Sequence, residues 1–211
     1  MPTDFDSKAK TWDDDPAKVE RARMAAAAIR AAVPVTPSMR LLEYGAGTGL
    51  TSQALADHIG SITLAEPSAG MRAVIADKIA AGNLPADARV WDLDLATGAV
   101  PDERFDLVAT VMTLHHIHDV ERVLHGFASL LAGGGYLCVV DLEEEDGSFH
   151  RSDGGFDGHH GFARAALTAQ LEAAGFTEVH FEPCHEVEQD GDRYALFLAT
   201  CTVAAAREPS A

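Results

Sequence analysis

Positive charge is scarce in this sequence of 211 residues. Lysine and arginine together number 16, against 33 aspartate and glutamate residues, so the formal net charge is −17. A surface of this sign repels phosphate backbones and anionic lipid headgroups. We therefore expect neither nucleic acid nor a membrane among the partners of this protein.

Cysteine is also scarce. Cys138, Cys184 and Cys201 lie far apart, they are odd in number, and no Cys-x-x-Cys pair occurs. Cys138 and Cys201 lie in apolar runs, where a thiol behaves as a small hydrophobic side chain. We interpret both as core residues.

Long apolar runs are missing. None approaches the roughly 20 residues that cross a bilayer, and the first 15 residues are acidic, without the apolar segment of a secretory signal. The cytoplasm is therefore the expected compartment. Apolar residues still make up 47% of the chain, which is enough for a sizeable core, and the length suits a single α/β domain over residues 1–211.

Strand-like and helix-like segments alternate along the chain. Residues 1–15 are expected to form a flexible arm and residues 204–211 a frayed tail. Asp15 followed by Pro16 predicts the start of a helix over residues 16–33. The core between residues 40 and 200 is predicted to contain seven strands, near 40–44, 61–65, 89–93, 105–112, 136–141, 178–181 and 194–200.

Helices are predicted between these strands, at residues 48–58, 68–81, 119–131 and 162–174. Strand–helix alternation favours a doubly wound, mostly parallel α/β sheet with helices on both faces. The last two strands are separated by a short segment with Asp190 followed by Gly191, which predicts a hairpin and hence an antiparallel edge strand.

A glycine-rich turn follows the first predicted strand, in the segment Glu43-Tyr44-Gly45-Ala46-Gly47-Thr48-Gly49. Ligands of open α/β sheets bind at the carboxyl ends of the strands, and glycine lets a ligand approach the backbone closely. A dinucleotide-binding turn would carry its third glycine at position 50, which is Leu50. The carboxylate of Glu43 would repel a pyrophosphate and attract an ammonium group. The turn therefore favours a ligand with a cationic amino acid part over NAD.

The sequence resembles the class I S-adenosylmethionine-dependent methyltransferases, especially small bacterial members with Leu-His-His after the fourth strand. The resemblance covers nearly the whole chain. Its motifs, in order, are LLEYGAGTGLT, ITLAEPSAGM, VWDLDL, FDLVATVMTLHHIHD, LLAGGGYLCVVD and FARAALTAQLEAAGF. It implies a seven-stranded Rossmann-like fold, the cofactor S-adenosyl-L-methionine, and methyl transfer to a small-molecule acceptor.

The resemblance also implies the residues that hold the methionine part of the cofactor. Glu43 would orient its ammonium group. The chain would pass beneath the methionine part at Gly45, Ala46 and Gly47. Met112 and Thr113 would turn backbone carbonyls toward the amine of the cofactor.

A second set of residues is implied at the ribose and adenine. Glu66, followed by Pro67, would accept hydrogen bonds from the ribose hydroxyls. Met71 would pack on the adenine face, with simple core packing as the alternative. Asp92 would accept from the adenine amino group beside the N–H of Leu93, and Asp94 is the less favoured substitute because it lies further past the strand end.

Three histidines, His115, His116 and His118, come directly after the fourth strand, beside the expected sulfonium. An imidazole titrates near pH 6.5, so His115, the best-placed candidate, is predicted as a general base. Methyl transfer to a good nucleophile needs mainly proximity and alignment. A reaction without a base is therefore the alternative interpretation.

The stretch over residues 141–160, after the fifth strand, is rich in acids and histidines. It is interpreted as a substrate-contacting segment, as a solvated lid, or as a metal site built from histidine and carboxylate ligands. The spacing matches no zinc pattern, so no metal ion is expected. Phe5 and Trp12 in the arm would form the other half of a lid or pack on the helices.

Two further functions stay open. One is a non-catalytic module that binds S-adenosylmethionine or its homocysteine product. The other is a nicotinamide-dependent oxidoreductase, which Leu50 and Glu43 disfavour. The acidic charge of the whole chain favours a neutral or cationic methyl acceptor.

Overall fold

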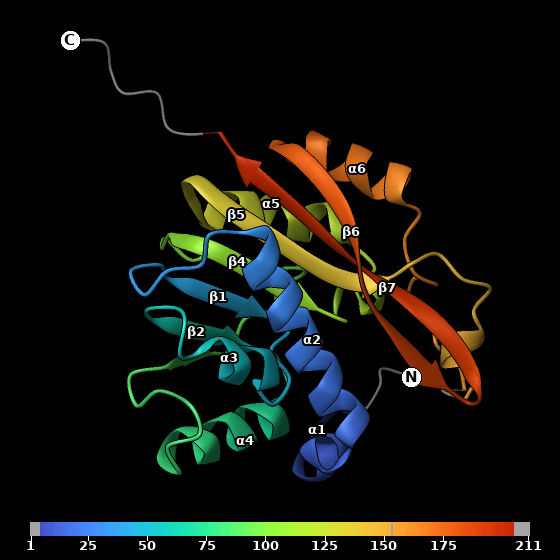
Figure 1. Cartoon of the computed structure of the whole chain (residues 1–211), viewed down its shortest axis with the longest axis horizontal. Coiled ribbons are helices and arrows are strands. Elements are labelled where there is room, and N and C mark those ends of the chain that lie inside the picture. Colours follow the sequence, from blue (N-terminus) through green and yellow to red (C-terminus); the bar gives the residue numbers. More distant parts are fainter. Residues whose placement is uncertain (1–4, 153, 205–211) are drawn as a thin grey trace.

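The computed structural model describes residues 5–152 and 154–204. Its centre is a seven-stranded sheet with the order β3-β2-β1-β4-β5-β7-β6 (Figure 1). The strands are β1 (Leu41–Tyr44), β2 (Ile62–Ala65), β3 (Arg89–Trp91), β4 (Phe105–Val111), β5 (Leu131–Leu142), β6 (Phe176–Gln189) and β7 (Asp192–Val203). Residues 1–4 of the predicted arm and 205–211 of the predicted tail lie outside the described residues.

The sheet is mixed. The five strands β3, β2, β1, β4 and β5 run parallel to one another, and β7 pairs antiparallel with both β5 and β6. Asp190 and Gly191 join β6 to β7 with φ angles of 53° and 88°, as a two-residue primed hairpin turn requires. The predicted doubly wound, mostly parallel Rossmann-like sheet with an antiparallel edge pair is confirmed.

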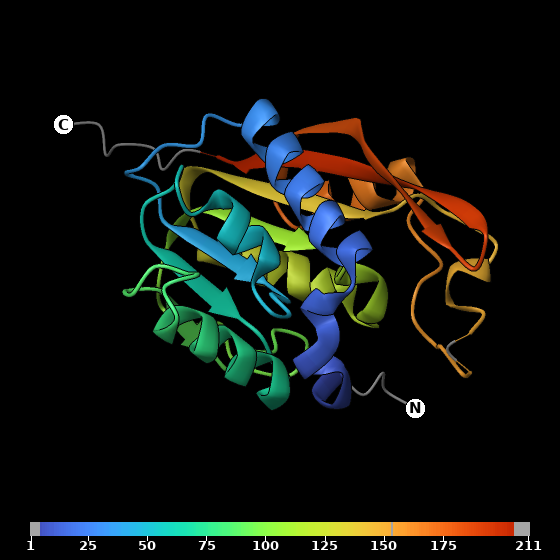
Figure 2. The ribbon, with the colours of Figure 1, turned by 60° about the horizontal axis from the view of Figure 1, so that its bottom comes forward.

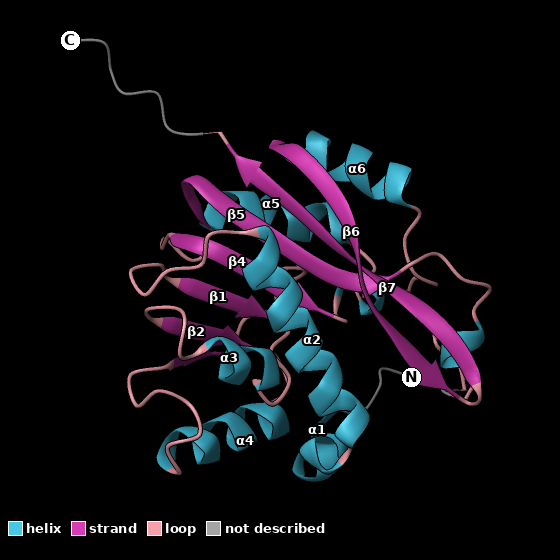
Figure 3. Ribbon diagram, viewed as in Figure 1, coloured by secondary structure: helices cyan, strands magenta, loops and turns pink. Residues whose placement is uncertain are grey.

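Helices cover both faces of the sheet (Figure 3). They are α1 (Phe5–Lys8), α2 (Pro16–Ala32), α3 (Leu50–Leu55), α4 (Ala69–Ala80), α5 (Val120–Leu130) and α6 (Arg164–Ala173), with 3-10 turns η1 (Ala9–Asp14), η2 (Leu114–His116) and η3 (Ser148–His150). α2, α3 and α4 pack on one face, and α5 and α6 on the other (Figure 2). The described residues thus bury two apolar cores, one on each side of the sheet.

Helix α2 begins where the sequence predicts. The Asp15 carboxylate accepts a hydrogen bond from the Ala17 N–H at 2.9 Å, and Pro16 occupies the first helical position. The buried side of the helix consists mainly of alanines, among them Ala22, Ala25 and Ala26. Small side chains let the helix lie close to the sheet and to the glycine turn.

The arm differs from the expected flexible segment, because its described residues form α1 and η1. The Asp6 carboxylate accepts from Ser68 Oγ at 2.5 Å and from the Gly70 N–H at 2.7 Å, at the start of α4. Asp13 accepts from Thr48 Oγ1 at 2.5 Å and pairs with Lys78. The arm is ordered by donors that lie far away in the sequence.

Candidate functional site

A cavity of about 920 Å³ opens at the carboxyl ends of β1, β2 and β4. Its volume suits a drug-sized ligand, because small-molecule sites span roughly 300–1,000 Å³. The arm and the first turns of α2 form the opposite wall, through side chains that include Phe5, Trp12 and Arg21. The site therefore lies at the switch point that the sequence predicts.

The glycine turn forms the floor of this cavity. Gly45, Gly47 and Gly49 have φ angles of 67°, 55° and 79°, in the left-handed region that favours glycine. A Cβ at Gly45 would lie 2.3 Å from Thr113 Cγ2, whereas a Cβ at Gly47 would meet none of the described atoms within 4 Å. The turn is thus packed tightly at Gly45 and leaves open space for a ligand at Gly47.

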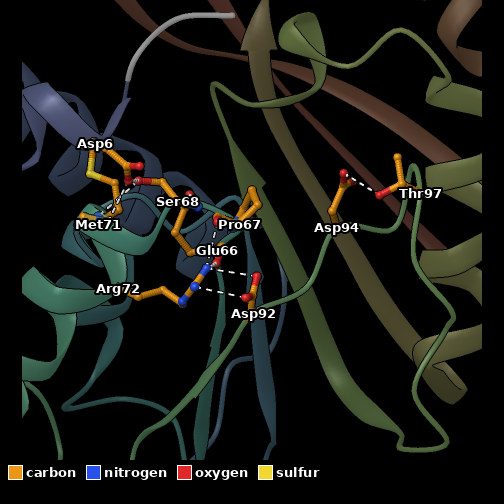
Figure 4. Close-up of polar contacts among 10 residues, drawn as sticks. Asp6, Glu66, Pro67, Ser68, Met71, Arg72, Asp92, Asp94 and Thr97 are labelled. Carbon is orange, nitrogen blue, oxygen red and sulfur yellow. Dashed lines mark hydrogen bonds and ion pairs between the residues drawn. The ribbon is translucent and has the colours of Figure 1, made fainter.

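Glu66 lies directly after β2 and lines the cavity (Figure 4). Its two oxygens accept backbone hydrogen bonds at 2.8 Å, Oε2 from Gly47 and Oε1 from Ser68. The side chain is buried, and this desolvation raises its pKa in spite of the two amides. Glu66 thereby holds the glycine turn to the start of α4.

Glu43 is buried beneath the turn and also lines the cavity. Its Oε2 accepts from the Ser52 N–H at 2.9 Å. Burial raises the pKa of Glu43 to about 7, although hydrogen bonds from Ser52 and Thr51 and the charge of Lys78 act in the opposite direction. A cationic group of a ligand placed here would stabilise the ionised carboxylate.

The two acids after β3 lie differently from what the sequence suggests. The side chain of Asp92 is 71% exposed and pairs with Arg72 through two contacts of 3.0 Å, outside the cavity (Figure 4). Leu93 belongs to the apolar core and does not line the cavity either. Asp94 does line it, and accepts from the Ala96 N–H and Thr97 Oγ1, each at 2.9 Å. β3 ends at Trp91, two residues earlier than predicted, and the acid that reaches the cavity is therefore Asp94 rather than Asp92.

The remaining candidates are brought together around one space. Met71 is 1% exposed and lines the cavity from α4. Met112 has a φ angle of 53°, which is unusual for a residue with a Cβ,. The predicted cofactor residues that line the cavity are Glu43, Gly45, Ala46, Gly47, Glu66, Pro67, Met71, Met112 and Thr113.

Arg21 lines the cavity, although no sequence motif indicates it. No hydrogen bond or ion pair to another described residue engages its guanidinium, and burial lowers its pKa against the opposing charges of Asp15 and Asp141. Arg21 lies one helical turn before Ala25, on the alanine-rich side of α2. An arginine next to the buried alanines of α2 is the signal that could have identified it,.

His115 is 1% exposed, and Asp141 beside it is fully buried. The distance from His115 Nδ1 to Asp141 Oδ1 is 2.6 Å. Burial tends to raise the pKa of Asp141, but the attraction of His115 and its hydrogen bonds outweigh burial and lower it. An ionised carboxylate only accepts, so the Nδ1 atom of His115 is the donor in this contact,. His116 is largely buried beside two other imidazoles, and burial first, then these neighbours, lower its pKa to about 3.

The stretch over residues 141–160 is only partly the solvated lid that the sequence allows. His150 is 6% exposed, lines the cavity and stacks on Phe156 with ring centroids 3.7 Å apart. His118, by contrast, is exposed and lies 3.6 Å from Asp157. Asp153 lies outside the described residues.

Comparison with known proteins identifies the family. A family model described as "Methyltransferase domain" matches residues 17–180. An uncharacterized methyltransferase from Schizosaccharomyces pombe is 33% identical over 118 residues, which cover 53% of this chain and 42% of that protein. The chain therefore belongs to the methyltransferase-domain family, as its motifs predict, and the family confirms S-adenosyl-L-methionine as the cofactor.

Solved structures share the fold. The complex of DhpI with S-adenosylhomocysteine has a TM-score of 0.70 and 23% identity, covering 95% of this chain and 93% of that one. The [4+2]-cyclase SpnF has a TM-score of 0.71 and 19% identity, covering 87% and 81%. The chain spans less than half the length of the first curated relatives that it matches. Within the described residues, no helix is long and apolar enough to cross a membrane.

The raised pKa of Glu43 leads to a prediction about stability. Folding favours the protonated carboxyl, so ionisation of Glu43 destabilises the folded protein. This destabilisation is absent below the unfolded pKa of 4.5, grows between pH 4.5 and about pH 7, and is complete above about pH 7,. In the ligand-free protein, Glu43→Gln keeps an acceptor for the Ser52 N–H and removes the ionisation. We expect it to be more stable than the wild type by up to about 3 kcal/mol above pH 7.

Urea unfolding of both proteins from about pH 5 to about pH 8 measures this difference. All other titrating groups are shared by the two proteins, so they cancel in the comparison. The gain in stability should shrink as the pH falls. A difference that does not change with pH would show that Glu43 is not the titrating group.

Proposed function

We propose that this chain transfers the methyl group of S-adenosylmethionine to a small-molecule acceptor. The observation that carries the proposal is the single cavity in which the open side of Gly47, the Glu66 carboxylate and the histidines after β4 face one space. When bound, the cofactor supplies an electrophilic methyl group on a sulfonium. The chain's own residues bind it, orient it and exclude water.

The charged residues suit the two ends of an amino acid zwitterion. Glu43 lies beneath the turn where an ammonium group is expected, and Arg21 provides a guanidinium with no partner among the described residues. A buried cation is costly unless it is paired. We propose that the carboxylate of the methionine part provides this pairing for Arg21.

Two acids suit the nucleoside end. Glu66 presents a carboxylate that is already fixed by the amides of Gly47 and Ser68, so little ordering remains when ribose hydroxyls bind,. Asp94 takes the place expected for Asp92 and would accept from the adenine amino group. Met71 is buried beside them and would contact the adenine face.

The acceptor would occupy the part of the cavity between the histidines and the arm. Phe5, Trp12 and Phe149 line this part. Asp6 and Asp13 fasten the arm to α4 and to the glycine turn, so the arm forms a fixed wall of the cavity. A cavity with such a wall, lined in part by aromatic rings, favours a small acceptor with an apolar or aromatic part.

The direct test is a turnover measurement. The fold is shared with a protein described as a [4+2]-cyclase, so binding alone does not establish methyl transfer. Purified protein incubated with S-adenosylmethionine and a panel of small hydroxyl, thiol and amine compounds should release S-adenosylhomocysteine with some of them. Tighter calorimetric binding of NAD than of S-adenosylmethionine would overturn the proposal. Tight binding with no release from any acceptor would favour the non-catalytic module.

Arg21 gives a prediction that separates the two ends of the cofactor. Arg21→Ala should weaken the binding of S-adenosylmethionine by about tenfold or more, because the cofactor carboxylate loses a charged hydrogen-bond partner. Binding of 5′-methylthioadenosine, which has no amino acid part, should change little. Arg23→Ala on the same helix is the matched control, because Arg23 is exposed and pairs with Glu20. Equal losses for both ligands, measured by calorimetry, would contradict the assignment.

The two acids after β3 give a second comparison. Asp94→Ala should weaken the binding of S-adenosylmethionine and of 5′-methylthioadenosine alike, by about tenfold, because both ligands contain adenine. Asp92→Ala removes an exposed carboxylate outside the cavity and should leave both affinities unchanged. Circular dichroism of both variants checks that the loop change has not unfolded the protein. A loss of affinity in Asp92→Ala alone would show that Asp92, the residue that the sequence favours, is the one that contacts adenine.

A further inference from the structure

Three imidazoles meet in the wall of the cavity. One ring nitrogen from each of His115, His116 and His150 lies within 4.8 Å of the corresponding atoms of the other two. His115 and His116 come from η2, directly after β4, and His150 comes from η3, beyond the end of β5. All three line the cavity.

We propose that His115, His116 and His150 bind one divalent transition-metal ion such as Zn²⁺, with its open coordination positions facing the cavity. Imidazole nitrogen is a preferred ligand of zinc and its neighbours in the first transition row, and a poor match for magnesium or calcium. Three protein ligands with an open position are the arrangement of catalytic zinc sites, whereas structural sites have four.

The surroundings of His115 match those of a metal-bound histidine. Asp141 engages its Nδ1 at 2.6 Å, which leaves Nε2 as the nitrogen available to an ion. The carboxylate also accepts from the Leu142 N–H at 2.8 Å, so it is fixed in place. A carboxylate behind a ligating imidazole fixes the ring orientation and raises its basicity. Asp141 also offsets part of the charge of a divalent ion.

The other two rings are held by aromatic contacts. Phe156 stacks on His150 with ring centroids 3.7 Å apart and an interplanar angle of 6°. Phe5 makes a T-shaped contact with His116, with ring centroids 5.4 Å apart. Two nitrogens on one tetrahedral zinc lie about 3.3 Å apart, because each Zn–N bond is about 2.0–2.1 Å long. The present separations are at most 4.8 Å, so they need to close by up to about 1.5 Å when an ion binds,.

An ion at this position would face the acceptor region between the histidines and the arm. Metal coordination lowers the pKa of a bound thiol or hydroxyl and so favours the anionic, nucleophilic form. We infer that the acceptor offers such a heteroatom to the ion and gives its proton to water. The heteroatom then bonds to the methyl carbon while the methyl–sulfur bond of S-adenosylmethionine breaks and S-adenosylhomocysteine leaves. This acceptor role rests on the proposed methyl transfer, whereas the metal site itself does not.

Metal titration of the full-length, tag-free protein, first treated with a chelator, tests the site. Co²⁺ should give visible d–d absorption that saturates at one equivalent per chain, and Zn²⁺ should abolish it by competition. His150→Ala should lose at least tenfold in affinity, and Asp141→Asn ten- to a hundredfold. His125→Ala, an exposed histidine on α5, should bind as the wild type does.

Calorimetry with S-adenosylmethionine, in the absence of metal, separates this inference from the proposed function. Cofactor binding without stoichiometric Co²⁺ uptake would overturn the metal site alone, and so would equal uptake by the wild type and His150→Ala. Metal uptake without cofactor binding would overturn the methyl-transfer proposal alone. If His150→Ala does not fold by circular dichroism, His116→Gln replaces it, with the same expected loss and the same contrary outcome.

Discussion

A single buried carboxylate connects the parts of this molecule that surround the cavity. Glu66 accepts from the amide of Gly47 with one oxygen and from the amide of Ser68 with the other. Ser68 in turn accepts from the Met71 N–H, caps α4 and donates its hydroxyl proton to Asp6 in the arm. The glycine turn, the start of α4 and the arm therefore depend on one chain of charge-assisted hydrogen bonds, which are stronger than bonds between neutral groups.

Much of the fold is encoded in local patterns that can be read without coordinates. The alternation of apolar strands with capped helices predicts the sheet, and Asp190-Gly191 predicts the hairpin because few other dipeptides adopt two successive positive φ angles,. The arm is different. Its order comes from donors at Thr48 and at the start of α4, which no local pattern in the arm reveals.

The cavity residues also divide into those that local sequence patterns predict and those that depend on distant parts of the chain. Glu66 and Gly47 lie where a strand meets a turn, and their placement follows from topology. Asp92 lies outside the cavity because β3 is two residues shorter than its apolar pattern suggests. Strand ends are set by pairing with the neighbouring strand rather than by composition,. The sequence singles out the stretch that contains His150, but it does not predict that His150 meets His115 and His116. His116 and His150 are 34 positions apart, and no periodicity describes the segment around His150.

Charge within the site does not follow charge on the whole chain. The formal charge of −17 favours a neutral or cationic acceptor, yet charges of both signs nearly balance in the cavity wall. It contains four histidines and the cations Lys8, Lys18 and Arg21, beside the acids Glu43, Glu66, Asp94 and Asp119. When an ion binds His115, His116 and His150, Asp141, which contacts His115, supplies one negative charge against the two positive charges of the ion. The remaining charge is best balanced by an acceptor that is neutral in solution and loses a proton at the metal. An acidic surface and an anionic nucleophile are then compatible, because the proton is given up only inside the cavity.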